Sequence, residues 1–181
     1  MFILPVTEDI ELRECGPHHA AELFALVQSN RVHLREWLPW LDQTTRPQHV
    51  EQFLRECRRR ADDGNGHTFM IMTQGRIVGL MGQHYVDTVD RKTELGYWLD
   101  AGHQGRGIMT CAVARTVDYV FDDLDLHRIV MHCAVGNTRS RAIPERLGFV
   151  LEGVLRQAQW LYTRYVDLAV YALLKDERRR I

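Results

Sequence analysis

A glycine-bearing turn between an apolar strand and an amphipathic helix constrains the fold of this chain more than any other stretch. The turn is residues 104–110; residues 94–99 before it are predicted to form a strand, and residues 111–121 after it carry apolar side chains at helical spacing. Gly105 and Gly107 let a ligand approach bare backbone at the start of the helix. The unpaired N–H groups of a first helical turn suit a phosphate or pyrophosphate.

Two other phosphate-binding patterns are excluded, because each lacks residues that its chemistry requires. A Walker loop requires Lys and then Ser or Thr where Ile108 and Met109 stand, and a dinucleotide fingerprint requires a third glycine where Thr110 stands. A glycine turn without any ligand stays an alternative on this stretch alone, because short glycine motifs often arise by chance.

The composition is that of a globular protein without a general affinity for nucleic acid or membranes. The 181 residues, 45% hydrophobic and 26% charged, are predicted to form one domain over residues 1–181. A net charge of −1 gives no general attraction to nucleic acid or anionic lipid. No apolar run approaches the ~20 residues of a membrane span. The arginine runs at residues 58–60 and 178–180 are predicted to lie at the solvated end of a helix and in a frayed tail.

The cysteines and histidines indicate neither a disulfide framework nor a metal site. The four cysteines, at positions 15, 57, 111 and 133, contain no CxxC pair. With no secretory signal, they predict a reduced, cytoplasmic location. The nine histidines form no HExxH or similar ligand set, so no metal is expected.

Patterns along the chain predict a mixed α/β fold. Strands are predicted at residues 10–14, 68–73, 76–82, 94–99, 128–134, 149–155 and 166–174, and helices from residue 17, over residues 49–63, from residue 111 and over residues 138–147. The first helix buries Ala20, Leu23, Phe24 and Val27, and the second turns Val50, Phe53, Leu54 and Cys57 inward. Asn137 is the predicted N-cap of the last helix. The strand–helix–strand order around the central turn implies one parallel pair within a sheet that is otherwise antiparallel.

Four motifs together resemble those of the GCN5-related N-acetyltransferases. Residues 104–109 are similar to motif A of that superfamily, and residues 137–149 resemble motif B, an Asn-x-x-Ser helix that ends in Leu-Gly-Phe. Residues 151–156 and 30–40 resemble a Glu-Gly-x-x-Arg tail and an Asn-x-x-His-Leu-x-x-Trp-Leu-Pro-Trp segment of the RimL-like branch, the ribosomal-protein N-acetyltransferases. Because the four motifs occur in the right order and spacing, from about residue 12 to residue 174, the chain is identified as a member of this superfamily.

The resemblance implies acetyl-CoA as co-substrate. The family fold is a mixed, mostly antiparallel sheet with helices on both faces, whose parallel strands splay apart around the thioester and pantetheine. Backbone groups of Tyr97, Trp98 and Leu99 would pair with pantetheine and polarise the thioester carbonyl. The pyrophosphate would be held by backbone amides of Gln104, Gly105, Arg106, Gly107, Ile108 and Met109, with Asn137 on the other side of the cofactor.

The chemistry needs a neutral amine, donors for an oxyanion and a proton for the departing thiolate. Ser140 matches the residue proposed as the acid in the RimL-like branch, and its alternative role is a helix cap or cofactor contact. The place of that branch's proposed base holds Gln159, which cannot take a proton. Glu94 resembles the base of the histone-type members, with a surface carboxylate as the alternative. Cys133 is more simply a buried inert thiol than a nucleophile.

The predicted function is transfer of an acetyl group from acetyl-CoA to a primary amine, the N-terminal α-amine of a ribosomal or other protein, by direct attack on the thioester. The alternatives are acetylation of a small-molecule amine and a non-catalytic acyl-CoA-binding role on the same fold. Trp37 and Trp40, from a predicted loop, are predicted to shape the acceptor site. No direct nucleic-acid or membrane partner is expected, and a homodimer is left open.

Overall fold

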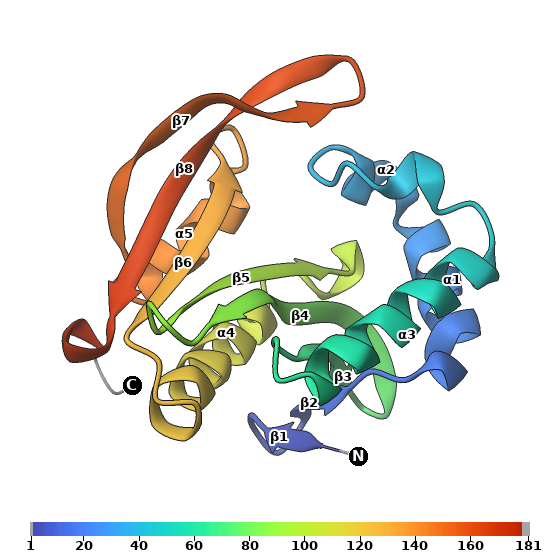
Figure 1. Ribbon diagram of the computed structural model, residues 1–181. Helices are drawn as coiled ribbons and strands as arrows, with labels where there is room; N and C mark the ends of the chain where they lie inside the picture. The colour runs from blue at the N-terminus through green and yellow to red at the C-terminus, as the bar shows by residue number, and fades with distance from the viewer. Residues whose placement is uncertain (1, 179–181) are drawn as a thin grey trace.

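An eight-stranded sheet, in the order β1-β2-β3-β4-β5-β6-β8-β7, organises the chain (Figure 1). The computed structural model describes residues 2–178. Neighbouring strands are antiparallel except β5 and β6, which are parallel. The predicted mixed, mostly antiparallel sheet with one parallel pair is confirmed.

The predicted strands and helices occur in the predicted order with several boundaries moved, and the short first strand, at residues 3–5, was not predicted. The strands are β1 (Ile3–Pro5), β2 (Ile10–Glu14), β3 (Thr68–Thr73), β4 (Arg76–Asp87), β5 (Lys92–Leu99), β6 (Arg128–Ala134), β7 (Val150–Leu161) and β8 (Arg164–Leu174). The helices are α1 (Ala20–Ser29), α2 (Arg31–Arg35), α3 (Pro47–Asp62), α4 (Ile108–Asp118) and α5 (Thr138–Arg146). Short 3-10 turns are η1 (Pro17–His19), η2 (Leu41–Gln43), η3 (Ala101–His103) and η5 (Lys175–Glu177), and a π-helical turn, η4 (Tyr119–Asp123), extends α4.

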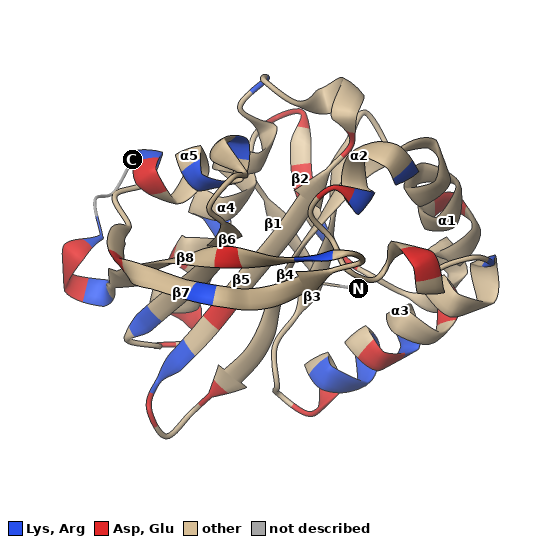
Figure 2. Cartoon of the chain, turned by 90° about the horizontal axis from the view of Figure 1, so that it is seen from above, with Lys and Arg blue, Asp and Glu red and all other residues tan. Residues whose placement is uncertain are grey.

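Helices cover both faces of the sheet, because each presents one apolar stripe to it. On one face, α4 and α5 pack in the main hydrophobic core with β5, β6 and β8. On the other face, α1 and α3 pack over β3 and β4. Helix α3 begins at Pro47, where a missing N–H costs little, and buries Val50, Leu54 and Cys57 at helical spacing. Its outer side carries charges of both signs (Figure 2).

Strands β5 and β6 part soon after they meet. Their parallel pairing covers only Lys92–Glu94 of β5 and Arg128–Val130 of β6. Beyond that point β5 continues beside β4, and β6 continues beside β8 to Ala134. The pairing with β6 therefore leaves one backbone edge of residues 95–99 of β5 facing a gap in the sheet (Figure 1).

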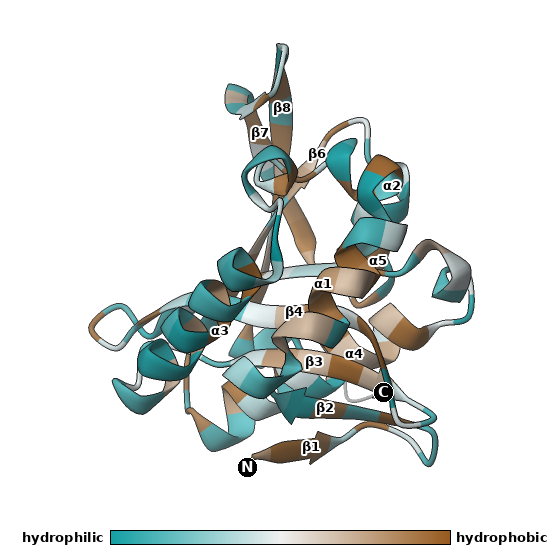
Figure 3. Cartoon of the chain, turned by 90° about the vertical axis from the view of Figure 1, so that its right-hand side faces the viewer, coloured by the Kyte–Doolittle hydropathy of each residue, from teal (hydrophilic) through white to brown (hydrophobic). Residues whose placement is uncertain are grey.

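The last hairpin is longer than the sequence predicts. Strand β7 reaches Leu161 instead of residue 155, and β8 starts at Arg164 instead of residue 166. The ladder is interrupted between Leu155 and Gln159, where the Gln157 N–H donates to the Asp167 carboxylate at 2.7 Å. The hairpin projects from the rest of the molecule (Figure 3). The polar run across this bulge hides the strand pattern, because alternation breaks there.

Several local predictions are wrong. Residues 30–40 contain α2 instead of a continuous loop. Phe53 is 40% exposed, not inward. Arg60 is not simply solvated, since its guanidinium donates to the carbonyl of His84 at 3.0 Å. Arg178 is not frayed: its side chain is 9% exposed and pairs with Asp122 at 2.9 Å. Residues 179 and 180 of that run lie outside the described residues.

Candidate active site

A cavity of about 700 Å³ lies where β5 and β6 separate. It brings together the predicted catalytic and acceptor residues with two histidines that the sequence did not single out. Its wall includes Trp37, Trp40, Glu94, Tyr97, Trp98, Asn137 and Ser140, and also His84, His132, Cys133 and Gln159. Leu99, which is buried in the main core at the end of β5, and residues 104–109, which lie beyond β5, are not part of this wall.

The glycine turn and the start of α4 form a separate backbone cradle. Gly105 and Gly107 have φ angles of 75° and 78°, the left-handed region that favours glycine. A Cβ added to either would meet nothing within 4 Å, so the space outside the turn is open. The first helical bond runs from the Cys111 N–H to the Gly107 carbonyl at 3.0 Å, which leaves the preceding amides without helical acceptors.

The outer side of this cradle is formed by main-chain groups, because the neighbouring side chains point into the core. Ile108 and Met109 are buried in the main core, so they contribute only main-chain groups to its outer side. Basic side chains surround it: Arg139 Nη1 donates to Gln104 Oε1 at 2.7 Å, and Arg146 Nη1 donates to Thr110 Oγ1 at 2.9 Å. Amides, the positive helix end and guanidinium groups together fit a pyrophosphate.

Ser140 is held at the start of α5, on the α4 side of the sheet. Its N–H donates to Asn137 Oδ1 at 3.1 Å, which confirms the predicted N-cap. Its Oγ lies 3.4 Å from the Tyr97 hydroxyl and 3.4 Å from Cys133 Sγ, and the Tyr97 hydroxyl donates to the Ser140 carbonyl at 2.9 Å. Burial, with the neighbouring Cys133, raises the pKa of Tyr97, and burial raises the pKa of Cys133. Both groups therefore stay protonated at neutral pH.

Glu94 lies between two histidines. Its Oε1 is 3.1 Å from His84 Nδ1 and 3.1 Å from His132 Nδ1. Burial acts to raise the pKa of Glu94, but the two imidazoles outweigh it and lower the pKa to about 2. The same carboxylate raises the pKa of His132 against the opposing effect of burial. No local pattern in the sequence indicates this cluster, because its residues come from three strands.

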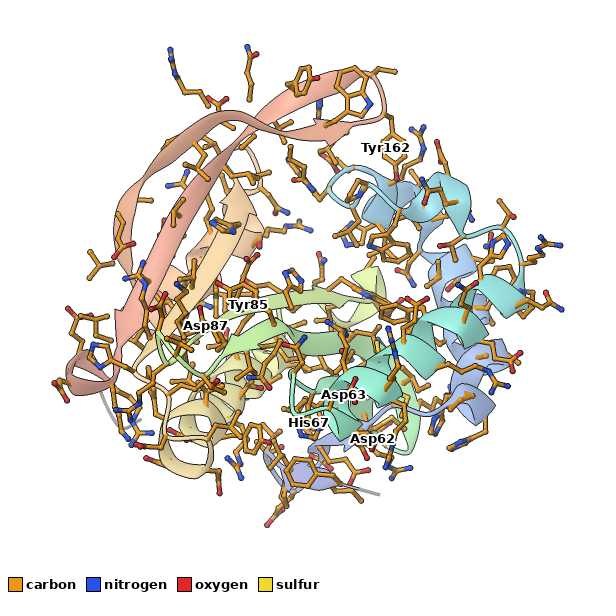
Figure 4. The ribbon with its side chains drawn as sticks, in the orientation of Figure 1. Asp62, Asp63, His67, Tyr85, Asp87 and Tyr162 are labelled. Carbon is orange, nitrogen blue, oxygen red and sulfur yellow. The ribbon has the colours of Figure 1, made fainter. Side chains whose placement is uncertain are left out.

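The hairpin tip and the segment after α2 meet above the cavity (Figure 4). The Tyr162 hydroxyl donates to the Leu38 carbonyl at 2.5 Å and accepts from the Leu41 N–H at 3.2 Å. The Arg35 guanidinium stacks 3.8 Å from the centre of the Tyr162 ring. Trp40, in the same segment, lies with its ring centre 6.5 Å from that of Trp98.

The comparison with known proteins decides the family. The family model described as acetyltransferase (GNAT) domain matches residues 9–150. This chain belongs to the GNAT family. The putative ribosomal N-acetyltransferase YdaF of Bacillus subtilis is 35% identical over 178 residues, covering 98% of this chain and 97% of YdaF. The ribosomal-protein-serine acetyltransferase of Escherichia coli is 31% identical over 183 residues, covering 97% of this chain and 98% of that protein.

The fold agrees with this assignment. A solved structure of RimL, a ribosomal L7/L12 α-N-protein acetyltransferase in complex with coenzyme A, has a TM-score of 0.93 at 28% identity, covering 96% of this chain and 98% of RimL. The predicted GNAT fold and the enzyme class, an acetyl-CoA-dependent N-acetyltransferase, are confirmed. The roles of individual residues in this GNAT chain stay predictions.

Across residues 2–178, no group of three or more His, Cys, Asp and Glu side chains is arranged to hold a metal ion. Within the same range, no helix has the length and apolar character needed to cross a membrane.

Proposed function

We propose that this enzyme acetylates the α-amine of a protein N-terminus, with a ribosomal protein as the acceptor. The two relatives that match almost the whole chain are named as ribosomal acetyltransferases, which supports this acceptor class. The observation that carries the proposal is the charge of the cavity wall. Glu94 is the one carboxylate there among the described residues, and Arg60 lies on the same wall. Such a wall suits an acceptor with a single amine better than a polyamine, which needs several carboxylates.

The cofactor is proposed to lie along the open edge of β5. Acetyl-CoA supplies the acetyl group as an activated thioester. The edge of the Tyr97–Leu99 segment that is turned away from β4 faces the gap left by β6, so it is available to an extended pantetheine arm. The amides of residues 104–109 hold the pyrophosphate in the glycine cradle. Asn137 uses its carbonyl oxygen as the N-cap, so its NH₂ group is the part that can contact the cofactor.

The acid and the acceptor site follow from the same geometry. Ser140 is proposed to protonate the departing thiolate, with the Tyr97 hydroxyl beside it at 3.4 Å. Trp37 and Trp40 shape the acceptor side. A Cβ on Gly136 would meet the Trp37 ring at 3.5 Å, which places Trp37 against the loop leading to Asn137.

The remaining expectations extend from this proposal. Residues 1–181 act as a single N-acetyltransferase domain, and a ribosomal acceptor implies action in the cytoplasm. Recognition of a free N-terminus requires no direct contact with nucleic acid or membrane. A homodimer stays a prediction.

The test measures release of free CoA in the presence of acetyl-CoA and three acceptors. These are a peptide with a free N-terminal Ser or Ala, the same peptide with its N-terminus blocked, and spermidine. We expect kcat/KM for the free peptide to exceed that for the other two by at least about tenfold, and mass spectrometry to locate the acetyl group on the α-amine. Preference for spermidine would contradict the proposal. Binding of acetyl-CoA with no turnover of any acceptor would favour the non-catalytic alternative.

A further inference from the structure

The Glu94 cluster fixes where the protons of two imidazoles lie. An ionised carboxylate accepts hydrogen bonds and cannot donate them. Glu94 Oε1 therefore receives the Nδ1 hydrogens of both His84 and His132, each at 3.1 Å. Each neutral ring then carries its proton on Nδ1 and keeps a lone pair on Nε2. The carboxylate therefore orients both imidazoles, and its Oε1 is already engaged in hydrogen bonds with them.

Strand register places this cluster at the point where the sheet opens. Glu94 is the last residue of β5 that pairs with β6, and its partner is Val130. His132 and Gly96 each lie two residues further along their strands, so they flank the start of the gap on the same face as Glu94. The gap is where the thioester is proposed to lie.

A bulge in β4 brings the second histidine to the same level. Gln83 pairs with Leu95 and Val86 pairs with Thr93, so His84 and Tyr85 together oppose Glu94 alone. A Cβ on Gly96 would lie 2.3 Å from His84 Nε2, which shows that the imidazole rests on the bare backbone of Gly96.

The acid and the histidines lie on opposite sides of the sheet. Tyr97 and Cys133, which contact Ser140, belong to the core on the α4 side. Successive side chains of a strand point to opposite faces, so His132 faces away from that core. An amine that enters beside His132 would therefore meet the base on one side of the gap. A thiolate that leaves beside Ser140 would meet the acid on the other side.

His132 is better placed than the other two residues to act as the base. Its side chain is 28% exposed, against 59% for His84, so its ring is the more firmly held. The hydrogen bond to Glu94 raises the pKa of His132 above the ordinary imidazole value, which makes its free nitrogen a stronger base. Glu94 itself, with a pKa of about 2, holds a proton too weakly for that role.

We propose that Nε2 of His132 accepts the proton of the acceptor amine and that Glu94 is a positioning residue that fixes the ring of His132. This rests on the proposed function. The acceptor ammonium gives one proton to His132, and the neutral amine nitrogen forms a bond to the acetyl carbon. The carbon–sulfur bond then breaks as the sulfur takes the proton of the Ser140 hydroxyl; the nitrogen releases its second proton to water, and Ser140 regains a proton from water. The imidazolium returns its proton to water.

Other ionisable groups near His132 define its pH response. Those on the cavity wall are His84 and Glu94 across the gap, Tyr97 and Cys133 toward the acid side, and His49 and Arg60 from α3. On β6, Arg128 lies two strand repeats away on the same face, and Glu152 of β7 pairs with it at 2.7 Å. Glu94 is the carboxylate in direct contact with the ring.

The activity test compares three variants over pH 6 to 9.5 with a free N-terminal peptide. His132→Gln keeps a donor for Glu94 and removes the base; we expect kcat at pH 7 to fall roughly 10- to 100-fold, with the loss shrinking at high pH. Glu94→Gln should shift the acidic limb of the kcat/KM profile to lower pH without abolishing it. His127→Gln, an exposed histidine next to β6, should match wild type. The proposal would be overturned if His132→Gln kept the wild-type rate. It would also be overturned if only Glu94→Gln lost the acidic limb of the kcat/KM profile.

A second measurement does not depend on turnover. Two-bond ¹⁵N–¹H spectra of the free protein should show His132 protonated at Nδ1 when neutral, with a pKa above 6.5 that falls in Glu94→Gln. A proton on Nε2, or a pKa unaffected by Glu94→Gln, would refute the proposal. Failure of wild type to acetylate any N-terminal peptide would count against the proposed function, and the spectra would still decide the state of His132.

Discussion

The hydroxyl of Tyr162 donates to the carbonyl of Leu38 at 2.5 Å, joining residues 124 positions apart in the chain. Tyr162 lies in the turn between β7 and β8, and Leu38 follows α2, so this bond closes one side of the cavity (Figure 4). The Leu41 N–H donates to the same hydroxyl. The side of the cavity proposed for the acceptor therefore depends on a contact between segments far apart in the sequence.

Tyr162→Phe should loosen this cover. The variant loses a hydrogen bond to Leu38 and one from Leu41, so we expect the free energy of unfolding to fall by about 1 to 2 kcal/mol. The peptide KM should rise severalfold while the acetyl-CoA dissociation constant stays within twofold. Tyr165→Phe, on the same hairpin with its side chain exposed, is the control. Equal effects of the two substitutions on KM would contradict a covering role.

Gly107→Val should weaken acetyl-CoA binding by at least about tenfold, because a side chain would occupy the cradle proposed for the pyrophosphate. The left-handed conformation also costs a substituted residue ~1–2 kcal/mol. Gly64→Val controls for that strain, since Gly64 has a φ of 69° and equally open surroundings, far from α4 in sequence. Calorimetric titration that gives both folded variants the wild-type affinity would remove the pyrophosphate from this turn.

Local patterns predict β2, β3 and β6 with the observed bounds, because each is an apolar or alternating run of five to seven residues. Residues 128–134 form β6 with the predicted bounds, and Asn137 caps α5 as its side-chain chemistry suggests. The extent of β7 was missed, because its bulge depends on the side chain of Asp167 from the neighbouring strand. Tertiary contacts of this kind leave no local trace in the sequence.

Ser140→Ala should lower kcat roughly 10- to 100-fold and leave the acetyl-CoA dissociation constant nearly unchanged, because the hydroxyl is proposed to act on the departing thiolate. The backbone N–H that bonds Asn137 is retained, so α5 keeps its cap. Ser29→Ala, at the end of α1, removes an exposed hydroxyl bonded to the Leu26 carbonyl and is the control. A loss of affinity as large as the loss of kcat would make Ser140 a cofactor ligand instead of the acid.

Alanine at Trp37 or Trp40 should raise the acceptor KM more than the acetyl-CoA KM. Both rings line the cavity, on the side proposed for the acceptor, and Trp40 also packs near Trp98. Trp160→Ala is the matched control, since that ring packs on Tyr165 at the exposed hairpin. A larger change in the acetyl-CoA KM would assign the two tryptophans to the cofactor instead.

The cluster of Glu94, His84 and His132 could not be predicted from the sequence. Glu94 was singled out by its distance from the glycine turn, but its partners come from β4 and β6. The ring of His84 reaches it through a bulge and a glycine contact that no motif records. A carboxylate that looks like a base in the sequence is, in the fold, already bonded to two imidazoles.

The last prediction is that an α-amine is acetylated faster than a lysine side chain at pH 7. An α-amino group has a pKa near ~7.8, so its deprotonation at pH 7 costs about 1.1 kcal/mol, whereas a lysine near ~10.4 costs about 4.6 kcal/mol. The amide of Gln159 cannot accept a proton. An imidazole such as His132 is a strong enough base to meet the smaller cost, that of deprotonating an α-amine. The preference should narrow as pH rises, because the lysine gains neutral amine over a range in which the α-amine is already deprotonated. The comparison uses a peptide with a free N-terminal Ser and no lysine, and an N-blocked peptide with one internal lysine. Faster turnover of the lysine peptide at pH 7 would require a stronger base than any group on this cavity wall supplies.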